Sequence, residues 1–307
     1  MSNQPQSKVD VLCIGTATLD LISLLPSYPQ ADSRVEALEM IFAGGGPAAT
    51  AAVTLTRLGQ KVEMTSAVGD DDLGQIVISG LADEGVGTKH IRVIEGARTT
   101  ISQVIVNSET SERLIVTKPG AEILDAVNTF DFDIEPIWIH LDQAGYEAID
   151  KSGKREFIFS KHFISIDGGN RIRNLNLQDV DLYAPTITEL SNLFGAELDE
   201  GQLIQKALEA GAKTVVATDG SNGSYSLENQ ELIHAEAFVG ATRSTLGAGD
   251  VFHGALLSGL MNNEKLNDAM ISANLAAFIS CEGIDGRSAV PTSRELQEAM
   301  ANTSRSE

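Results

Sequence analysis

Apolar strand-like runs alternate with helical patterns through most of this chain, and the alternation limits its possible folds more than any other feature. Such a pattern predicts an α/β fold, a doubly wound, mostly parallel sheet with helices on both faces. Sheets of this kind bind ligands beyond the carboxyl ends of their strands. The expected strands are Val9–Ile14, Lys61–Ser66, Ile137–Asp142, Phe163–Asp167, Val180–Ala184 and Thr214–Thr218, with helices near 48–58, 73–81, 145–152, 187–195, 201–211, 265–281 and 292–301.

Two segments, about 16–43 and 98–118, hold short strand-like pieces with no helix between them. Thr100–Asn107 and Arg113–Lys118 flank a polar loop, which predicts a hairpin. We interpret both segments as a small β-sheet that forms a lid over the active-site face; the alternative is two surface excursions with no shared role. Because no internal repeat or linker interrupts the chain, we expect one domain over residues 1–307.

Composition excludes several classes of partner. The chain has 307 residues, 42% of them hydrophobic and 21% charged, as in an ordinary soluble globular protein. A net charge of −21 argues against nucleic acid or an anionic membrane as partner. Met1–Lys8 has no apolar signal region, and the uncharged stretch Met40–Thr56 is too rich in glycine to span a membrane. With Cys13 and Cys281 in apolar surroundings, we expect reduced core thiols in a cytoplasmic protein.

A glycine-rich turn at residues 244–250 ends in an aspartate where an apolar helix begins. The first amides of a helix have no intrahelical partner and attract anions, and glycine lets the backbone approach a ligand. Asp250 would repel a resting anion, but it suits a base that takes a proton from a hydroxyl attacking a bound phosphate. The alternative is a glycine turn with an aspartate cap. Phe252, Ala255 and Leu256 follow at helical spacing, so we expect one helix face to pack inward.

Other polar and glycine-rich positions suggest ligand contacts, and most of them have a structural alternative. Gly44–Pro47 opens the first long helix and is either a polar-ligand loop or a plain turn. Asp20 follows the first strand, where it could accept hydrogen bonds from two sugar hydroxyls or serve as a turn residue. Thr218–Gly223 closes a late strand and suits a nucleotide site. Glu189 could hold magnesium through water or be a solvated helix charge.

Several catalytic classes lack their motifs. The sequence has neither a phosphate loop of the Gly-x4-Gly-Lys-Ser/Thr kind nor a Gly-x-Gly-x-x-Gly fingerprint after the first strand. It also has no Cys/His cluster with metal spacing and no nucleophile-elbow motif. We expect His253 to be a packed helix residue.

Taken in order, these pieces resemble the ribokinase-like (PfkB) carbohydrate kinases along nearly the whole chain. The resemblance implies a doubly wound α/β domain with a β-sheet lid, ATP and Mg²⁺ as cofactors, and a small-molecule sugar as acceptor. The motifs that carry it are Gly15…Asp20, the run 44–53 ending in Arg57-Leu58-Gly59, Val68–Gly74, Thr218…Gly223, Gly247–Asp250 and Ala273-Asn274…Pro291-Thr292.

The resemblance also implies a role for each matching residue. Asp250 would deprotonate the acceptor hydroxyl, and the amides of Gly247, Ala248 and Gly249 would form an anion hole for the transferred phosphoryl group. Glu189 would organise magnesium. The sugar would face Asp20, Gly45, Gly46 and Thr50, and ATP would face Thr218, Gly220, Gly223 and Asn274.

Three positions depart from the family pattern. Thr50 stands where the family usually has asparagine, which alters sugar hydrogen bonding. The Asn-x-x-Glu motif appears as Thr186-Ile187-Thr188-Glu189 and keeps only the glutamate. Ser244 replaces an aspartate often associated with a monovalent-cation site, so we expect no potassium activation.

Within the family, residues 44–53 and 247–256 look most like the sulfofructose kinase branch, which phosphorylates the 1-hydroxyl of 6-deoxy-6-sulfo ketoses. Such a substrate needs donors for its anionic tail, for which Lys118 is the first candidate and Arg113 and His140 follow. The alternative for Lys118 is a solvated lysine on a lid edge. The segment 141–145 lacks an arginine that this branch uses near its substrate.

The leading functional hypothesis is an ATP-dependent kinase that phosphorylates a primary hydroxyl of a ketose, either a sulfofructose or a fructose-like sugar. One alternative is a nucleoside or sugar-acid kinase of the same family, of the 2-keto-3-deoxygluconate type. A third hypothesis is a catalytically idle regulator that binds a sugar or nucleotide, prompted by the missing asparagines at 50 and 186. Lids of this type often pair between subunits, so we expect a homodimer.

Overall fold

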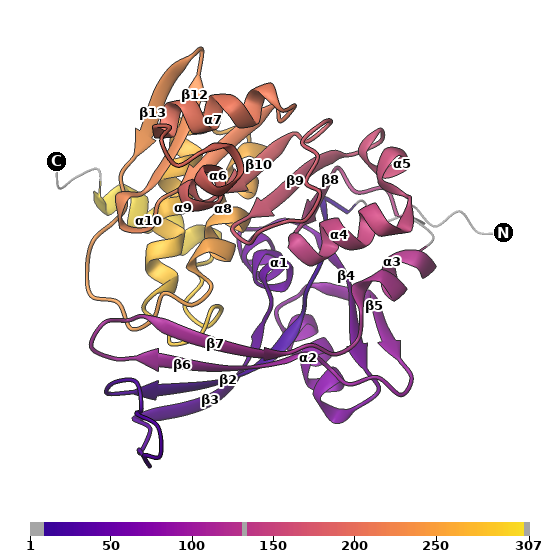
Figure 1. The fold of residues 1–307 in the computed structure, drawn as a ribbon, viewed down its shortest axis with the longest axis vertical. Helices are drawn as coiled ribbons and strands as arrows, with labels where there is room; N and C mark the ends of the chain where they lie inside the picture. The colour runs from indigo at the N-terminus through magenta and orange to yellow at the C-terminus, as the bar shows by residue number, and fades with distance from the viewer. Residues whose placement is uncertain (1–8, 131–133, 304–307) are drawn as a thin grey trace.

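The computed structural model describes residues 9–130 and 134–303, so the segment Met1–Lys8 lies outside the described residues. Two sheets organise the described part of the chain: a nine-stranded sheet surrounded by helices, and a four-stranded sheet that projects from it (Figure 1). No helix in these residues is long and apolar enough to cross a membrane.

The large sheet runs in the order β13-β12-β11-β10-β9-β8-β1-β4-β5. Neighbouring strands from β11 to β5 are parallel, whereas β12 and β13 are antiparallel additions at one edge. This arrangement confirms the predicted doubly wound, mostly parallel fold. The strands are β1 (Val11–Ile14), β4 (Val62–Gly69), β5 (Gly87–Ile94), β8 (Trp138–Leu141), β9 (Phe163–Gly168), β10 (Leu182–Pro185), β11 (Thr214–Thr218), β12 (Ser224–Glu228) and β13 (Glu231–Ala235).

Helices cover both faces of this sheet and create two apolar cores. One core lies under α1 (Pro47–Arg57), α2 (Asp72–Asp83), α8 (Ala248–Met261), α9 (Leu266–Ser280) and α10 (Ser293–Thr303). The other lies under α3 (Ile123–Thr129), α4 (Gln143–Ser152), α5 (Arg155–Phe159), α6 (Ile187–Phe194) and α7 (Glu200–Glu209). A short 3-10 helix, Gly220–Asn222, follows β11.

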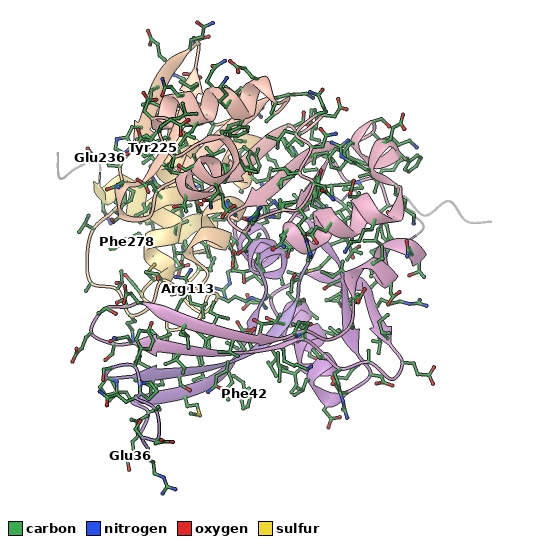
Figure 2. The ribbon with its side chains drawn as sticks, in the orientation of Figure 1. Glu36, Phe42, Arg113, Tyr225, Glu236 and Phe278 are labelled. Carbon is green, nitrogen blue, oxygen red and sulfur yellow. The ribbon has the colours of Figure 1, made fainter. Side chains whose placement is uncertain are left out.

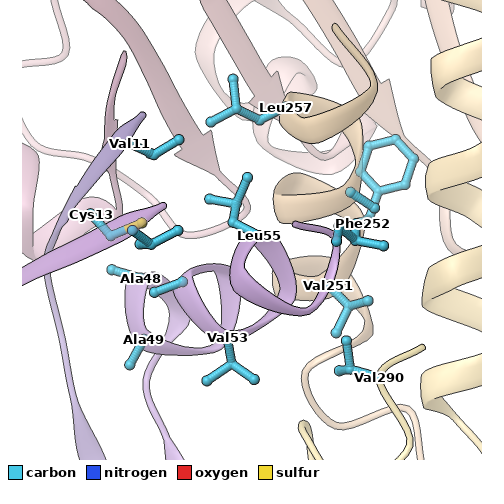
Figure 3. Close-up of a cluster of buried hydrophobic side chains, with 14 of the residues drawn as sticks. Val11, Cys13, Ala48, Ala49, Val53, Leu55, Val251, Phe252, Leu257 and Val290 are labelled. Carbon is cyan, nitrogen blue, oxygen red and sulfur yellow. The ribbon is translucent and has the colours of Figure 1, made fainter. Parts of the chain in front are cut away.

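The alternating side chains of strand β1 contribute to both cores. Val11 and Cys13 point into the α1/α8 core, and Leu12 and Ile14 point into the other, because successive residues of a strand face opposite sides. Figure 3 shows Val11 and Cys13 near α1, with α8 side chains packed on the other side of that helix. Cys13 and Cys281 are both buried free thiols, as predicted.

The four-stranded sheet is the predicted lid, and we use that name below. It contains β2 (Thr18–Leu25), β3 (Glu39–Gly45), β6 (Ile101–Asn107) and β7 (Arg113–Lys118) in the order β3-β2-β6-β7. β6 and β7 form the expected hairpin. The register Asp20↔Ser102↔Thr117 places these three residues in one row on one face of the lid.

Several elements differ from the sequence prediction, including the short helices α3 and α5, which were not predicted. Strands β5, β12 and β13 were not predicted. β5 and β13 are the two edges of the sheet and intersperse charged residues among their apolar ones, and β12 has serines at its buried positions. Helix α8 was expected to bury one face, but every residue from Val251 to Gly259 is buried. The physical reason is that α8 packs between α1 and α9 and so has apolar neighbours on opposite sides.

Candidate active site

The carboxyl ends of the parallel strands and the inner face of the lid enclose a cavity of about 560 Å³, which we call the lid cavity. The strand side contributes Thr16 after β1, Asp167 on β9 and Thr218 at the end of β11. The lid side contributes Asp20, Ser102, Ile115 and Thr117, and the start of α8 forms the floor. This is the sheet edge where the topology predicts a ligand.

A second cavity of about 560 Å³, the helix cavity, lies against α8, α9 and the loop after β11. Its walls combine apolar side chains, such as Phe252 and Phe278, with the glycine turn at 220–223. The two cavities share Arg113, Thr186, Thr218 and Gly249, so they meet at the start of α8. Figure 2 places Arg113 on the side of the lid that faces the main domain, with Phe278 beyond it on α9.

The turn before α8 gives the site its anion-binding geometry. Gly247 caps the helix with φ 76°, a left-handed conformation that favours glycine. A Cβ at this position would also lie 2.6 Å from the Cα of Gly286. The amide of Val251 donates to the carbonyl of Gly247 and starts the helical ladder, and the amide of Ala248 makes a 3.4 Å bond to Thr245. The positive end of α8 therefore points toward the junction of the cavities.

Asp250 lies in the first turn of α8, partly exposed at the floor of the lid cavity. Burial by the surrounding protein, followed by the charge of Asp167, raises the pKa of Asp250 to about 7. The nearby charges of His253 and Arg113 act in the opposite direction. A carboxylate with such a pKa is a stronger base than an ordinary aspartate and is still largely ionised above neutral pH.

A buried ion pair lies beside Asp250. Nδ1 of His253, one turn further along α8, lies 3.0 Å from Oδ2 of Asp167. Burial disfavours the charged ring, but the Asp167 carboxylate outweighs it and raises the pKa of His253. His140 on β8 lies behind this pair and contacts the hydroxyl of Ser165, and burial lowers its pKa to about 4. His140 is therefore neutral, and it lies outside both cavities.

The lid side of the cavity presents a carboxylate held for hydrogen bonding. Oδ1 of Asp20 accepts from the hydroxyl of Thr18 at 2.8 Å, while Gly45 on β3 packs against the same carboxyl group. A Cβ at Gly45 would lie 2.1 Å from Oδ2 of Asp20, so this approach requires glycine. The backbone of β3 can therefore lie next to a ligand that Asp20 binds.

Asp142, beyond the end of β8, fixes the strand ends around the cavity. Its buried carboxylate accepts from the amides of Thr16 at 2.7 Å, Gly145 at 2.8 Å and Ala48 at 3.3 Å. These bonds join the end of β1 to the starts of α1 and α4. Burial raises the pKa of Asp142, and the backbone donors partly offset that effect.

Comparison with known proteins assigns the family. Residues 8–293 match the family described as pfkB family carbohydrate kinase. The chain belongs to the pfkB family of carbohydrate kinases. This pfkB protein is 24% identical to a deoxyribokinase of Salmonella typhi over 308 residues, which cover 95% of this chain and 99% of that protein. The predicted family and enzyme class are thereby confirmed.

Solved structures confirm the fold. A ribokinase of Thermotoga maritima superimposes with a TM-score of 0.82 at 22% identity, covering 96% of this chain and all of that one. An Arabidopsis thaliana ribokinase complexed with ribose and ATP gives a TM-score of 0.75 at 21% identity, with 95% and 98% covered. The narrower resemblance to sulfofructose kinases has no support among these matches and stays a prediction.

The structure brings most of the predicted site residues of this pfkB protein together, around the two cavities. Three predicted residues line neither cavity: Lys118 is exposed at the end of β7, Glu189 lies in the first turn of α6, and His140 is buried on β8. The lid cavity contains Asp20, Gly45, Gly46, Thr50, Gly247 and Asp250, the helix cavity contains Gly220, Gly223, Ala248 and Asn274, and Thr218 and Gly249 line both.

Sequence reasoning missed several residues of the site. Asp167, Asp142 and Arg287 were not singled out, and His253 was assigned to packing alone. Asp142 and Asp167 end strands at the ligand-binding edge of the sheet, and that position could have identified them. Arg287 lies in a loop after α9. Nothing in the sequence connects it to Gly45 and Thr50, the cavity residues that it contacts, which precede it by 242 and 237 positions.

Among the described residues, no group of three or more His, Cys, Asp or Glu side chains is placed to hold a metal ion. Magnesium that arrives with a nucleotide needs only one or two protein carboxylates, because phosphates and waters supply its other ligands. Glu189 accepts a hydrogen bond from Asn192 at 3.2 Å and keeps carboxylate oxygen free for such a water-mediated role. A nucleotide-borne ion would take most of its ligands from phosphates and water, with Glu189 as the candidate protein carboxylate.

Proposed function

We propose that this pfkB protein transfers the γ-phosphoryl group of ATP to a primary hydroxyl of a sugar, with Asp250 as the base. One observation carries the proposal: the two cavities meet at Gly249, next to a carboxylate whose pKa is about 7. One cavity is suited to a polyhydroxylated acceptor and the other to a nucleotide. The names of its relatives, a deoxyribokinase and ribokinases, agree with this assignment.

In the proposed reaction, the ionised Asp250 takes the proton of the acceptor hydroxyl as its oxygen attacks the γ-phosphorus. The bond from that phosphorus to the β–γ bridging oxygen breaks, and ADP leaves with the electron pair. The amides of Gly247, Ala248 and Gly249 stabilise the charge on the transferred group. Arg113 lines both cavities, and its Nη1 donates to the Thr245 hydroxyl at 2.9 Å, so it can neutralise the same group from the lid.

The nucleotide would occupy the helix cavity, with its base near Asn274 and Phe278 and its phosphates toward Gly249. Asn274 is held by bonds from its side-chain amide to the Ser224 hydroxyl and the carbonyl of Ala235. Magnesium bound to the phosphates would neutralise their charge, with Glu189 contacting it through water. The turn at Gly220–Gly223 lets the backbone lie close to the nucleotide.

The lining of the lid cavity favours a neutral, hydroxyl-rich sugar, and we propose a fructose-like ketose or a pentose as the first candidate. Asp20, Thr50 and Thr117 supply hydrogen-bonding groups, while Arg113 is the one lysine or arginine among the described lining residues and lies at the phosphoryl-transfer point. A 6-deoxy-6-sulfo ketose remains a second candidate. Its sulfonate would need Lys118 or a second subunit to supply a cation.

A panel assay tests this function. ADP release from MgATP would be measured with fructose, sulfofructose, ribose, deoxyribose, 2-keto-3-deoxygluconate and nucleosides. We expect turnover with at least one of them and a loss of about 10²- to 10⁴-fold in kcat for Asp250→Asn, with nucleotide affinity retained. Asp268→Asn, which changes a first-turn aspartate on the surface of α9, is the matched control.

Each outcome of the panel has a defined meaning. Nucleosides or the sugar acid as best substrate would favour the related kinases of the same family over a ketose or pentose kinase. No ADP release with any acceptor, with nucleotide binding intact, would favour a sugar- or nucleotide-binding regulator. Near-wild-type turnover by Asp250→Asn would refute the role of the base.

We also propose a homodimer formed through the lid. The register places Phe42, Leu21, Gln103 and Val116 in one row, on the lid face opposite Asp20, and Phe42 and Val116 are 70% and 60% exposed. Figure 2 shows Phe42 on β3 and Arg113 on β7, the two edge strands of the lid. Such an apolar face is covered in most soluble proteins. Light scattering is expected to give a dimer that Phe42→Glu dissociates; a wild-type monomer at micromolar concentration would contradict it.

A further inference from the structure

Arg287 is a buried cation behind the wall of the lid cavity. The side chain comes from the loop after α9 and is 7% exposed. Its Nη2 donates to the carbonyl of Gly45 at 2.7 Å, and its Nε donates to the hydroxyl oxygen of Thr50 at 3.3 Å. Both acceptors line the lid cavity, one from β3 and one from α1. Arg287 therefore links a distant loop to two residues that face the acceptor.

The surrounding structure holds this guanidinium in place. Oδ1 of Asp285 accepts from the amides of Arg287 at 3.2 Å and Ser288 at 2.8 Å, which fixes the loop. Gly44 on β3 leaves room for Nη1 of Arg287, because a Cβ at residue 44 would lie 2.1 Å from that nitrogen. An unpaired buried charge is costly, so a buried arginine must have compensating partners. Besides its hydrogen bonds, Arg287 has the favourable charges of the carboxylates of Asp20, Asp250, Glu84 and Asp285.

The contact with Thr50 determines which hydrogen-bonding role that hydroxyl can play. A guanidinium has only donors, so the Thr50 oxygen must accept from Nε. The one hydrogen of the hydroxyl then has to point elsewhere, and among the described residues no protein group accepts it. Because Thr50 lines the lid cavity, this hydrogen is available to a ligand oxygen. Asp20, when ionised, offers only acceptors to the same cavity.

We infer that Arg287 is a specificity-determining positioning residue that makes Thr50 a hydrogen-bond donor to the acceptor sugar. This inference rests on the proposed function. The cavity then presents a matched pair, with Thr50 donating to one sugar oxygen and Asp20 accepting from a hydroxyl. Thr50 has a shorter side chain than the asparagine that is usual in the family. Arg287, 237 positions later in the chain, orients its hydroxyl from the side away from the cavity. Burial raises the pKa of Asp20, and its hydrogen bond from Thr18 and the positive charge of Arg287 partly offset that effect.

Steady-state kinetics on the best sugar from the panel test the inference. Arg287→Met is expected to raise the KM for sugar about tenfold or more while the KM for ATP stays within about twofold. Thr50→Val should raise the sugar KM by a similar factor, and Thr50→Ser, which keeps the hydroxyl, should not. In the Arg287→Met background, Thr50→Val should add little, because its donor role is already lost.

Arg57→Met is the matched control. Nη1 of Arg57 donates to the carbonyls of Val290 at 2.7 Å and Ser288 at 3.4 Å, so this arginine supports the same loop but does not line the lid cavity. A general loosening of the loop would raise the sugar KM in both arginine variants. The inference expects the change only for Arg287→Met, with Arg57→Met within about twofold of wild type.

Thermal unfolding separates recognition from folding. If Arg287→Met fails to fold, Arg287→Lys keeps the charge but cannot make both contacts, and it should still raise the sugar KM selectively. A folded variant with wild-type sugar KM, equal losses toward sugar and ATP, or additive effects with Thr50→Val would each overturn the inference while leaving the kinase function standing. No turnover by the wild-type enzyme with any sugar would instead refute the proposed function and this inference with it.

Discussion

The raised pKa of Asp250 makes the pH dependence of turnover a direct test of its role as base. A base must be ionised to accept a proton, so activity should be lost as the pH falls through the pKa of about 7. By the usual titration curve, about 10% of such a carboxylate is ionised at pH 6 and about 90% at pH 8. The expected fall in kcat/KM for the sugar is therefore about tenfold between pH 8 and pH 6.

An ordinary aspartate would behave differently. With a pKa of about 3.9 it would be ionised throughout this range, and the profile would be flat. The assay is ADP release at saturating MgATP and constant ionic strength, from pH 5.5 to 9. The Asp167→Asn variant is a second test. After burial, the charge of Asp167 is the main cause of the raised Asp250 pKa, so its removal should shift the pH profile to lower pH. A flat profile between pH 6 and 8, with chemistry rate-limiting, would refute the assignment of Asp250 as the base.

The structure supports three further predictions. Asp142→Ala should lower the free energy of unfolding by about 3 kcal/mol or more, because three backbone donors lose their buried acceptor. Denaturant titration measures this loss. Asp142→Asn, which keeps one acceptor oxygen, should lower the free energy of unfolding by less, and equal losses would contradict this reason. Gly247→Ala should reduce kcat about 10²-fold, since the Cβ would displace the anion-binding turn toward Gly286; an unchanged kcat would show that this turn does not contact the transferred group. Replacing potassium with sodium should change kcat/KM less than about twofold, because buried Ser244 accepts from the Leu246 amide at 3.1 Å and offers no charge; strong potassium dependence would contradict that expectation.

Local patterns predicted much of the fold. Buried parallel strands such as β1 and β9 are short apolar runs, and helices such as α2 repeat apolar residues at helical spacing, so both classes can be read without tertiary information. The strands β5, β12 and β13, at or next to the edges of the large sheet, could not be predicted in this way. Many side chains of β5 and β13 are partly solvated, and the buried side chains of β12 are serines, so pairing with neighbouring strands, not burial of an apolar face, defines these strands.

The site residues also divide into those that a local sequence pattern predicts and those that only the folded chain brings together. Glycine turns such as Gly247–Asp250 and Gly44–Gly46 have a local signature, because close backbone approach requires glycine at specific positions. The sequence by itself therefore determined the layered fold, the lid segments and the pieces of the catalytic turn. Lys118 and Glu189 were also singled out from local context, and in the folded chain they lie outside both cavities.

Only the tertiary structure decided which charges meet. Asp167 raises the pKa of Asp250 because β9 ends against the first turn of α8, and Arg287 orients Thr50 because a late loop folds behind α1. The contacts join residues 83 and 237 positions apart, by subtraction of their numbers, and no periodicity records such a pairing. Electrostatic and hydrogen-bonding energies depend on distance in space, and folding alone sets those distances.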